Sequence, residues 1–225
     1  MAKHVLITGF EPFGGAKLNP SEMVARALEG RRTAGRLVVT RILSVETQGL
    51  RDRLQSVLQE TDPEVVVSLG QAAGRTAIAL ERVAINVLDF EQPDNAGIMH
   101  TKTPIFRNGP DARIATLPFE QIVERWRADG IPGYVSNSAG AYICNQSFYE
   151  LLGFSEAALQ PFAAAFVHLP YLPEQAAAAG AESTPSMSLE LMIRAVEAML
   201  EVLVAWAPSR GATAIPPTSL KKVSL

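Results

Sequence analysis

The chain has 225 residues, of which 48% are hydrophobic and 19% are charged, and its formal net charge is -3 at pH 7. This composition is typical of one large globular domain, or at most two small ones, and excludes a largely disordered chain. A negative net charge leaves no basic face for nucleic acid or an anionic membrane, and a single cysteine cannot form an internal disulfide.

The N-terminal residues are not typical of a targeting segment. The apolar run that starts at residue 5 is too short for a signal sequence, and no small-residue cleavage site follows it. The most apolar long segment, residues 195–207, contains Glu197 and Glu201 and is too short to cross a membrane. The sequence therefore predicts a soluble, cytoplasmic protein with no nucleic-acid or membrane partner.

Predicted strands and helices alternate along the chain. Strands are expected at residues 4–8, 37–43, 64–69, 76–88 (with a bend), 133–136 and 160–170, and helices after residue 19, at 47–60, at 118–128, after residue 144 and at 187–206. Residues 89–113 and 176–185 are expected to be irregular. This order predicts a three-layer α/β/α sandwich with a twisted, mostly parallel central sheet. We expect residues 1–208 to form a single catalytic α/β domain and residues 209–225 a mobile C-terminal tail.

Unusual side chains follow two of the predicted strands. Phe10 and Phe13 stand in a glycine-rich loop after the first strand, where they either fold back onto the core or form flat walls of an apolar pocket. Gln71 stands in a turn after the third strand, where it either faces solvent or exchanges hydrogen bonds with an amide.

Glu81 lies in the middle of an apolar run, where burial of a carboxylate is costly unless the group is paired or hydrogen-bonded. The adjacent Arg82 would point to the opposite face of a strand, so it is a poor direct partner. The alternative is that Glu81 is an ordinary surface residue of an edge strand.

The only cysteine, Cys144, lies where a loop enters a predicted helix. Unsatisfied N–H groups at a helix start favour the thiolate, which is the nucleophilic form, although a lone cysteine can also be a small buried apolar residue. A thiol nucleophile needs a base and a third group that fixes the tautomer of the base. His168 is the one histidine expected at a strand end near a loop, where it is either catalytic or structural. Cys144, His168 and Glu81 are therefore the candidate set.

Four segments also carry a resemblance to a known family. Residues 9–15 (GFEPFGG), 70–82 (GQAAGRTAIALER), 138–145 (SAGAYICN) and 166–170 (FVHLP) resemble, in this order, segments of the pyroglutamyl peptidase I family, also called pyrrolidone carboxyl peptidases. The resemblance implies a cysteine peptidase that removes an N-terminal pyroglutamyl residue from peptides. It also implies a three-layer α/β/α fold, no metal or other cofactor, and a cytoplasmic homotetramer.

The same resemblance assigns roles by position. It implies that Cys144 is the nucleophile, that His168 is the general base and acid, and that Glu81 orients the imidazole. The predicted substrate-binding residues are Phe10 and Phe13 as walls around the lactam ring, Gln71 and Asn19 close to that pocket, and Tyr142 beside the nucleophile. Ala141 and Ile143 stand where threonine and valine are common in the family, and residues 98–103 (IMHTKT) depart from its loop, so contacts from that loop stay open.

Three rival functions were weighed against this interpretation. A nucleoside phosphorylase would need a basic phosphate cradle, for which Arg75 and Arg82 are the candidates, but the glycine-rich turns lack the lysine of a P-loop. A lactam-binding protein without catalysis would bind pyroglutamyl peptides and not turn them over. A serine hydrolase using Ser138 is disfavoured because no Gly-x-Ser-x-Gly elbow occurs.

Overall fold

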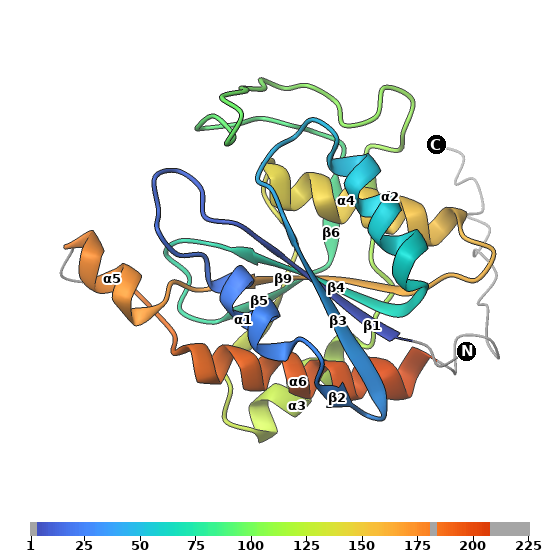
Figure 1. The fold of residues 1–225 in the computed structure, drawn as a ribbon, viewed down its shortest axis with the longest axis vertical. Coiled ribbons are helices and arrows are strands. Elements are labelled where there is room, and N and C mark those ends of the chain that lie inside the picture. Colours follow the sequence, from blue (N-terminus) through green and yellow to red (C-terminus); the bar gives the residue numbers. More distant parts are fainter. Residues whose placement is uncertain (1–3, 181–183, 208–225) are drawn as a thin grey trace, which may run out of the picture.

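The computed structural model describes residues 4–180 and 184–207 of the chain. They form a seven-stranded sheet, in the order β2-β3-β1-β4-β9-β5-β8, with helices on both of its faces (Figure 1). The strands are β1 (His4–Phe10), β2 (Arg32–Thr33), β3 (Arg36–Leu43), β4 (Pro63–Gln71), β5 (Ile78–Glu81), β8 (Gly133–Ser136) and β9 (Ala163–Leu169). The helices are α1 (Pro20–Leu28), α2 (Leu50–Thr61), α3 (Phe119–Ala128), α4 (Ile143–Ala157), α5 (Pro173–Ala179) and α6 (Leu189–Trp206).

The sheet is parallel in its centre and mixed toward its edges. Strands β3, β1, β4 and β9 are parallel, whereas β5 is antiparallel to β9 and parallel to β8. Helices α2 and α4 cover one face, and α1, α3 and α6 cover the other (Figure 1). The prediction of a three-layer α/β/α sandwich with a mostly parallel sheet is confirmed. The tail expected at residues 209–225 lies outside the described residues.

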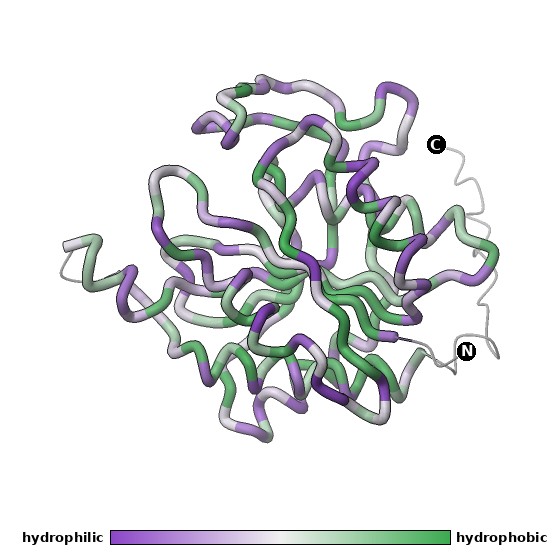
Figure 2. Tube along the Cα trace, viewed as in Figure 1, coloured by the Kyte–Doolittle hydropathy of each residue, from purple (hydrophilic) through white to green (hydrophobic). Residues whose placement is uncertain are grey.

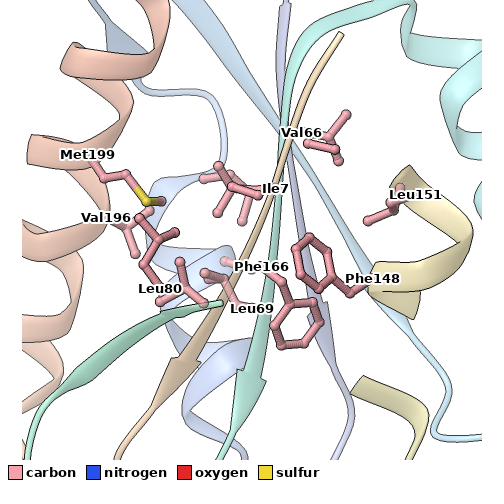
Figure 3. Close-up of a cluster of buried hydrophobic side chains, with 14 of the residues drawn as sticks. Ile7, Val66, Leu69, Leu80, Phe148, Leu151, Phe166, Val196 and Met199 are labelled. Atoms are coloured by element: carbon pink, nitrogen blue, oxygen red, sulfur yellow. The ribbon is translucent and has the colours of Figure 1, made fainter. Parts of the chain in front are cut away.

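The core lies on both faces of the central strands. Figure 2 shows that these strands are hydrophobic along most of their length, as expected for strands that are covered on both sides. In Figure 3, Val196 and Met199 of α6 lie on one side of the strands, and Phe148 and Leu151 of α4 lie on the other. The ring of Phe166 on β9 packs against Phe148, with 5.7 Å between the ring centroids. This contact identifies the side of the sheet on which even-numbered residues of β9 lie.

The run at residues 76–88, expected to be one bent strand, is two strands in different sheets. Strand β5 ends at Glu81, and β6 (Val83–Ile85) pairs with β7 (Ala112–Ile114) in a separate two-stranded sheet. The break falls at Arg82, whose N–H donates to Ser136 O at 2.7 Å while its guanidinium lies 5.1 Å from the centroid of the Phe119 ring. Hydropathy alone does not distinguish this arrangement from a continuous strand.

Two segments expected to be irregular contain regular elements. Residues 89–113 include most of β7, and the small-residue loop expected at 176–185 begins inside α5. Pro173 at the first turn and a run of alanines, the strongest helix former, account for this helix. Within residues 4–180 and 184–207, no helix combines the length and apolar character that a membrane span requires.

Candidate active site

Strand register brings Glu81 and His168 to the face of the sheet that α4 covers. His168 lies two residues after Phe166, so both side chains point toward α4. In the neighbouring strands, Gly70 of β4 and Ala79 of β5 are the register partners of His168. Glu81, two residues after Ala79, therefore points to the same face. The alternation of side chains along β5 and β9 is thus sufficient to aim both groups into one space.

His168 and Glu81 form a direct hydrogen bond. His168 Nδ1 lies 2.8 Å from Glu81 Oε1, and the two side chains are 5% and 0% exposed. A carboxylate can only accept, so Nδ1 carries the proton and Nε2 is left as the basic nitrogen of the neutral imidazole. The carboxylate therefore fixes the tautomer that a general base requires.

Glu81 has a second partner, Arg75, which the sequence analysis considered only for a phosphate site. Arg75 Nη1 donates to Glu81 Oε1 at 3.1 Å and to Tyr134 Oη at 3.1 Å. Glu81 Oε2 has no hydrogen-bond partner among the described residues. A buried carboxylate is expected to have a cationic partner, but this expectation does not say which arginine is the partner of Glu81. Neither candidate arginine forms a phosphate cradle, because Arg82 stacks on Phe119.

Cys144 is the second residue of α4. The N-cap position is occupied by Tyr142, whose backbone is extended and whose side chain does not cap the helix. The first N–H groups of α4 consequently have no capping acceptor, and they point toward the space in front of the helix. The position at a helix start that was expected for Cys144 is thus observed.

Gly70 allows the thiol to approach the sheet. A Cβ atom at this position would lie 2.8 Å from Cys144 Sγ and 2.9 Å from Phe166 Cζ. Because Gly70 is the register partner of His168, the sulfur and the imidazole lie beside the same residue. No role was predicted for Gly70, although a glycine inside a strand pattern often marks such a close approach.

In the free protein, burial outweighs the helix-start effect that was expected to favour the thiolate. Burial raises the pKa of Cys144 to about 12, and the charge of Glu81 acts in the same direction. The backbone N–H at the helix start and Arg75 lower this pKa, but their effect is smaller. Burial also lowers the pKa of His168, against the opposing effect of Glu81. The resting site therefore holds a neutral thiol beside a neutral imidazole.

A small, narrow cavity opens next to the sulfur. It is lined by Phe10, Phe13, Asn19, Val45, Gln71, Tyr142, Ile143 and Cys144. All five residues predicted to bind substrate are in this set, together with Val45 and Ile143, for which no substrate contact was predicted. The rings of Phe13 and Tyr142 face each other at 5.9 Å between centroids. The cavity is thus mainly apolar, with few polar groups in its wall.

The polar side chains in the wall differ in how far they are engaged. Asn19 Oδ1 caps α1 by accepting from Ser21 N at 3.0 Å, and Asn19 Nδ2 donates to Glu11 O at 2.9 Å. Gln71 Oε1 accepts from Gln175 Nε2 at 2.8 Å, which leaves Gln71 Nε2 without a partner among the described residues. Asn19 therefore shapes the cavity, whereas Gln71 keeps a donor for a ligand.

The loop after residue 92 is fastened over this cavity. Tyr142 Oη donates to Pro93 O at 3.1 Å, and Asp94 Oδ2 accepts from Thr47 N at 2.9 Å. Asn95 Nδ2 donates to Glu11 Oε1 at 2.7 Å. These contacts come from residues 93–95, so the unusual sequence at 98–103 does not remove the attachment.

A second, wider cavity continues from the first toward solvent. The two share Phe13, Gln71 and Tyr142 in their walls. The outer cavity is also lined by two carboxylates, Asp89 and Glu91, and by no lysine or arginine. Within the described part of the chain, no group of three histidine, cysteine or carboxylate side chains is placed to hold a metal ion.

Comparisons with known proteins agree over most of the chain. The sequence profile of a family described as pyroglutamyl peptidase matches residues 3–205. A pyrrolidone-carboxylate peptidase of Thermococcus onnurineus is 44% identical over 197 residues, 88% of this chain and 96% of the relative. Another, of Chromobacterium violaceum, is 48% identical over 174 residues, 77% of this chain and 80% of the relative. The solved pyrrolidone carboxyl peptidase of Thermococcus litoralis matches with a TM-score of 0.88 and 38% identity, over 92% of this chain and 96% of that chain.

Proposed function

This chain belongs to the pyroglutamyl peptidase family of cysteine peptidases, which remove N-terminal pyroglutamyl residues, and from that premise we propose that Cys144, His168 and Glu81 carry out the reaction. The observation that carries the proposal is the hydrogen bond of 2.8 Å from His168 Nδ1 to Glu81 Oε1, beside a thiol that lies against Gly70. This arrangement supplies a nucleophile, a base and a group that orients the base.

We assign the lactam ring of the substrate to the cavity beside Cys144. Pyroglutamate has no free α-amine, so a site that reads a positive charge would not hold it. A flat, neutral ring suits the walls formed by Phe10, Phe13 and Tyr142. We expect Gln71 Nε2, which has no partner among the described residues, to donate a hydrogen bond to the lactam carbonyl.

The first chemical step forms a thioester. As Cys144 Sγ attacks the pyroglutamyl carbonyl carbon, His168 Nε2 takes the thiol proton, so that a sulfur with a raised pKa reacts without a preformed thiolate. The imidazolium formed in this step is stabilised by the Glu81 carboxylate. The carbonyl oxygen gains negative charge, which the uncapped N–H groups at the start of α4 stabilise. His168 then gives its proton to the leaving amine.

The second step releases pyroglutamate. A water molecule takes the place of the leaving peptide, and His168 removes a proton from it as it attacks the thioester carbonyl. The C–S bond breaks, and the sulfur recovers its proton from the imidazolium. Each group thus returns to its starting state without a cofactor.

The proposal is tested by hydrolysis of a pyroglutamyl chromogenic amide with the wild-type protein and with Cys144→Ser and Glu81→Gln. We expect Cys144→Ser and prior treatment with iodoacetamide each to abolish turnover, while circular dichroism shows an unchanged fold. Glu81→Gln is expected to lower kcat by about 10²- to 10⁴-fold, because the imidazole loses its fixed tautomer. Full activity of Cys144→Ser would refute the role of the sulfur, and tight binding without turnover by the wild type would favour a lactam-binding protein.

The cytoplasmic location and the homotetramer that the family resemblance implies remain part of this proposal. Sedimentation velocity of the purified chain tests the tetramer directly, and a monomer at assay concentration would contradict it.

A further inference from the structure

The structure places a fourth side chain, Arg75, in line with the proposed catalytic residues. We propose that Arg75 is a positioning residue, whose guanidinium holds the Glu81 carboxylate in the place that orients His168. The inference rests on the function proposed above, because it concerns the same site. Arg75 itself reaches neither the cavity nor the sulfur in its observed contacts, so it acts through Glu81.

Both hydrogen bonds of the Glu81 carboxylate are made by the same oxygen. Glu81 Oε1 accepts from His168 Nδ1 at 2.8 Å and from Arg75 Nη1 at 3.1 Å. The other oxygen, Oε2, is buried and unpartnered among the described residues. Turning the carboxylate away from this orientation would therefore break both hydrogen bonds, and Oε2 has none to replace them. With Arg75 in place, the orientation that binds the imidazole is the one that also satisfies the guanidinium.

The guanidinium of Arg75 also compensates the burial of Glu81. The Glu81 side chain is 0% exposed, and a buried carboxylate is costly unless it is paired and hydrogen-bonded. Burial lowers the pKa of His168, which favours its neutral form at rest, so Arg75 is the cation that lies against the carboxylate.

The backbone around Arg75 fixes the direction of its side chain. The residue follows Gly74, whose positive φ of 77° turns the chain after β4 back toward β5. Its Nη1 atom also donates to Tyr134 Oη on β8, at 3.1 Å. Strand β8 pairs with β5, and Tyr134 is the register partner of Ala79. Arg75 is thus held by the strand that lies beside the one carrying Glu81.

The groups that act electrostatically on His168 are few. From β5 the charge of Glu81 raises the pKa of His168, and from the turn Arg75 lowers it. From α4, Cys144 contributes a neutral thiol at rest. Arg75 also lowers the pKa of Cys144, in opposition to Glu81. Removal of the Arg75 charge is therefore expected to raise the pKa of both reacting groups.

The test compares Arg75→Gln, which removes the charge, with Arg75→Lys, which keeps it. Arg82→Gln is the matched control, because it removes the same charge from the next residue after Glu81, where the guanidinium stacks on Phe119 outside the site. The pKa of His168 is measured by NMR on protein labelled at histidine, which has three signals, from His4, His100 and His168. The pH profile of kcat/KM is measured on the same samples.

We expect Arg75→Gln to raise the pKa of His168, to move the acid limb of kcat/KM to higher pH, and to lower kcat/KM by about tenfold to a hundredfold. Arg75→Lys should leave the limb in place but lower kcat several-fold, since a shorter ammonium cannot hold Glu81 and Tyr134 as the guanidinium does. Arg82→Gln should change neither quantity. A purely structural role would lower activity without moving the titration of His168.

An unshifted pKa of His168 in folded Arg75→Gln, or the same shift in Arg82→Gln, would overturn the proposal. If Arg75→Gln does not fold, wild-type kcat/KM in Arg75→Lys would overturn it. The NMR titration needs no turnover, so it tests the role of Arg75 independently of the proposed reaction. A failed Cys144→Ser test would refute the proposed reaction, whereas an unmoved titration would refute only the role of Arg75.

Discussion

Gly70 offers a direct test of whether the approach of the sulfur to β4 matters for catalysis. In Gly70→Ala the new Cβ would lie 2.8 Å from Cys144 Sγ and 2.9 Å from the ring of Phe166. Comfortable contact needs about 3.5–4.0 Å, so the sulfur and the ring must each move by about 1 Å. Phe166 packs edge-on against His168, with 5.0 Å between centroids, so its displacement reaches the base as well.

The size of the effect follows from that displacement. A misplacement of about 1 Å between reacting groups lowers the rate by about a hundredfold, so we expect kcat for a pyroglutamyl amide to fall by this factor. Overpacking costs about 1–3 kcal/mol of folding free energy. For a chain of this size each kcal/mol lowers Tm by about 2–4 °C, so the variant remains folded at assay temperature. Steady-state kinetics and thermal unfolding measure the two effects separately.

Gly153→Ala is the matched control for this substitution. Gly153 lies in α4, and a Cβ there would meet the Arg113 guanidinium at 3.3 Å and no residue of the cavity. That guanidinium is paired with Glu156 and lies over Tyr149, so its displacement offsets the gain from an alanine in a helix, and we expect little net change in stability. Wild-type kcat in Gly70→Ala, or an equal loss in Gly153→Ala, would refute the reasoning.

Three further expectations follow from the site. Because burial lowers the pKa of His168 from 6.5 and the base must be neutral, activity is lost as pH falls through a value below 6.5. A pH profile of kcat/KM with an acid limb above 6.5 would contradict this. Asn145→Ala removes three hydrogen bonds to the β6 segment and should destabilise the fold by about 2–4 kcal/mol, measured by urea unfolding. A loss of folding free energy below about 0.5 kcal/mol, which is usual for a surface substitution, would contradict this expectation. Asp89 and Glu91 in the outer cavity should favour a lysine over a glutamate after pyroglutamate, and Asp89→Asn with Glu91→Gln should remove that preference. The preference is measured as kcat/KM for two peptides that differ only at this residue, at low and at high salt. A preference that neither the two substitutions nor high salt reduces would contradict this expectation.

Much of the fold could be predicted from the sequence because the central strands are unusually regular. The nearly continuous apolar runs at residues 64–69 and 163–167 are typical of buried parallel strands. The division at Arg82 was not predictable in this way. At this break the Arg82 side chain lies over Phe119, which is 37 residues away along the chain, and no local pattern predicts such a contact.

The site was predicted in part by the rule that functional groups gather beyond the carboxyl ends of strands. That rule locates Phe10, Gln71 and His168, which end or follow parallel strands. It does not locate Glu81, because β5 is antiparallel to β9, and the cost of burying a carboxylate is what singled this residue out. Arg75 required knowledge of which turn folds back onto β5.

The protonation of Cys144 could not be read from its position at a helix start. The local effect of the backbone N–H is present and lowers the pKa, as expected. It is outweighed by burial and by Glu81, which comes from another strand. A sequence pattern identifies the helix start, but it does not show the burial of the sulfur or the nearby charge of Glu81.

A sulfur that keeps its proton at rest has a consequence for the durability of the protein. Peroxide and other oxidants attack the ionised form of cysteine, so the free protein presents them with a poor target. Vulnerability should rise only while substrate occupies the cavity and the proton is moving. Storage in air should therefore harm this protein less than turnover in the presence of peroxide.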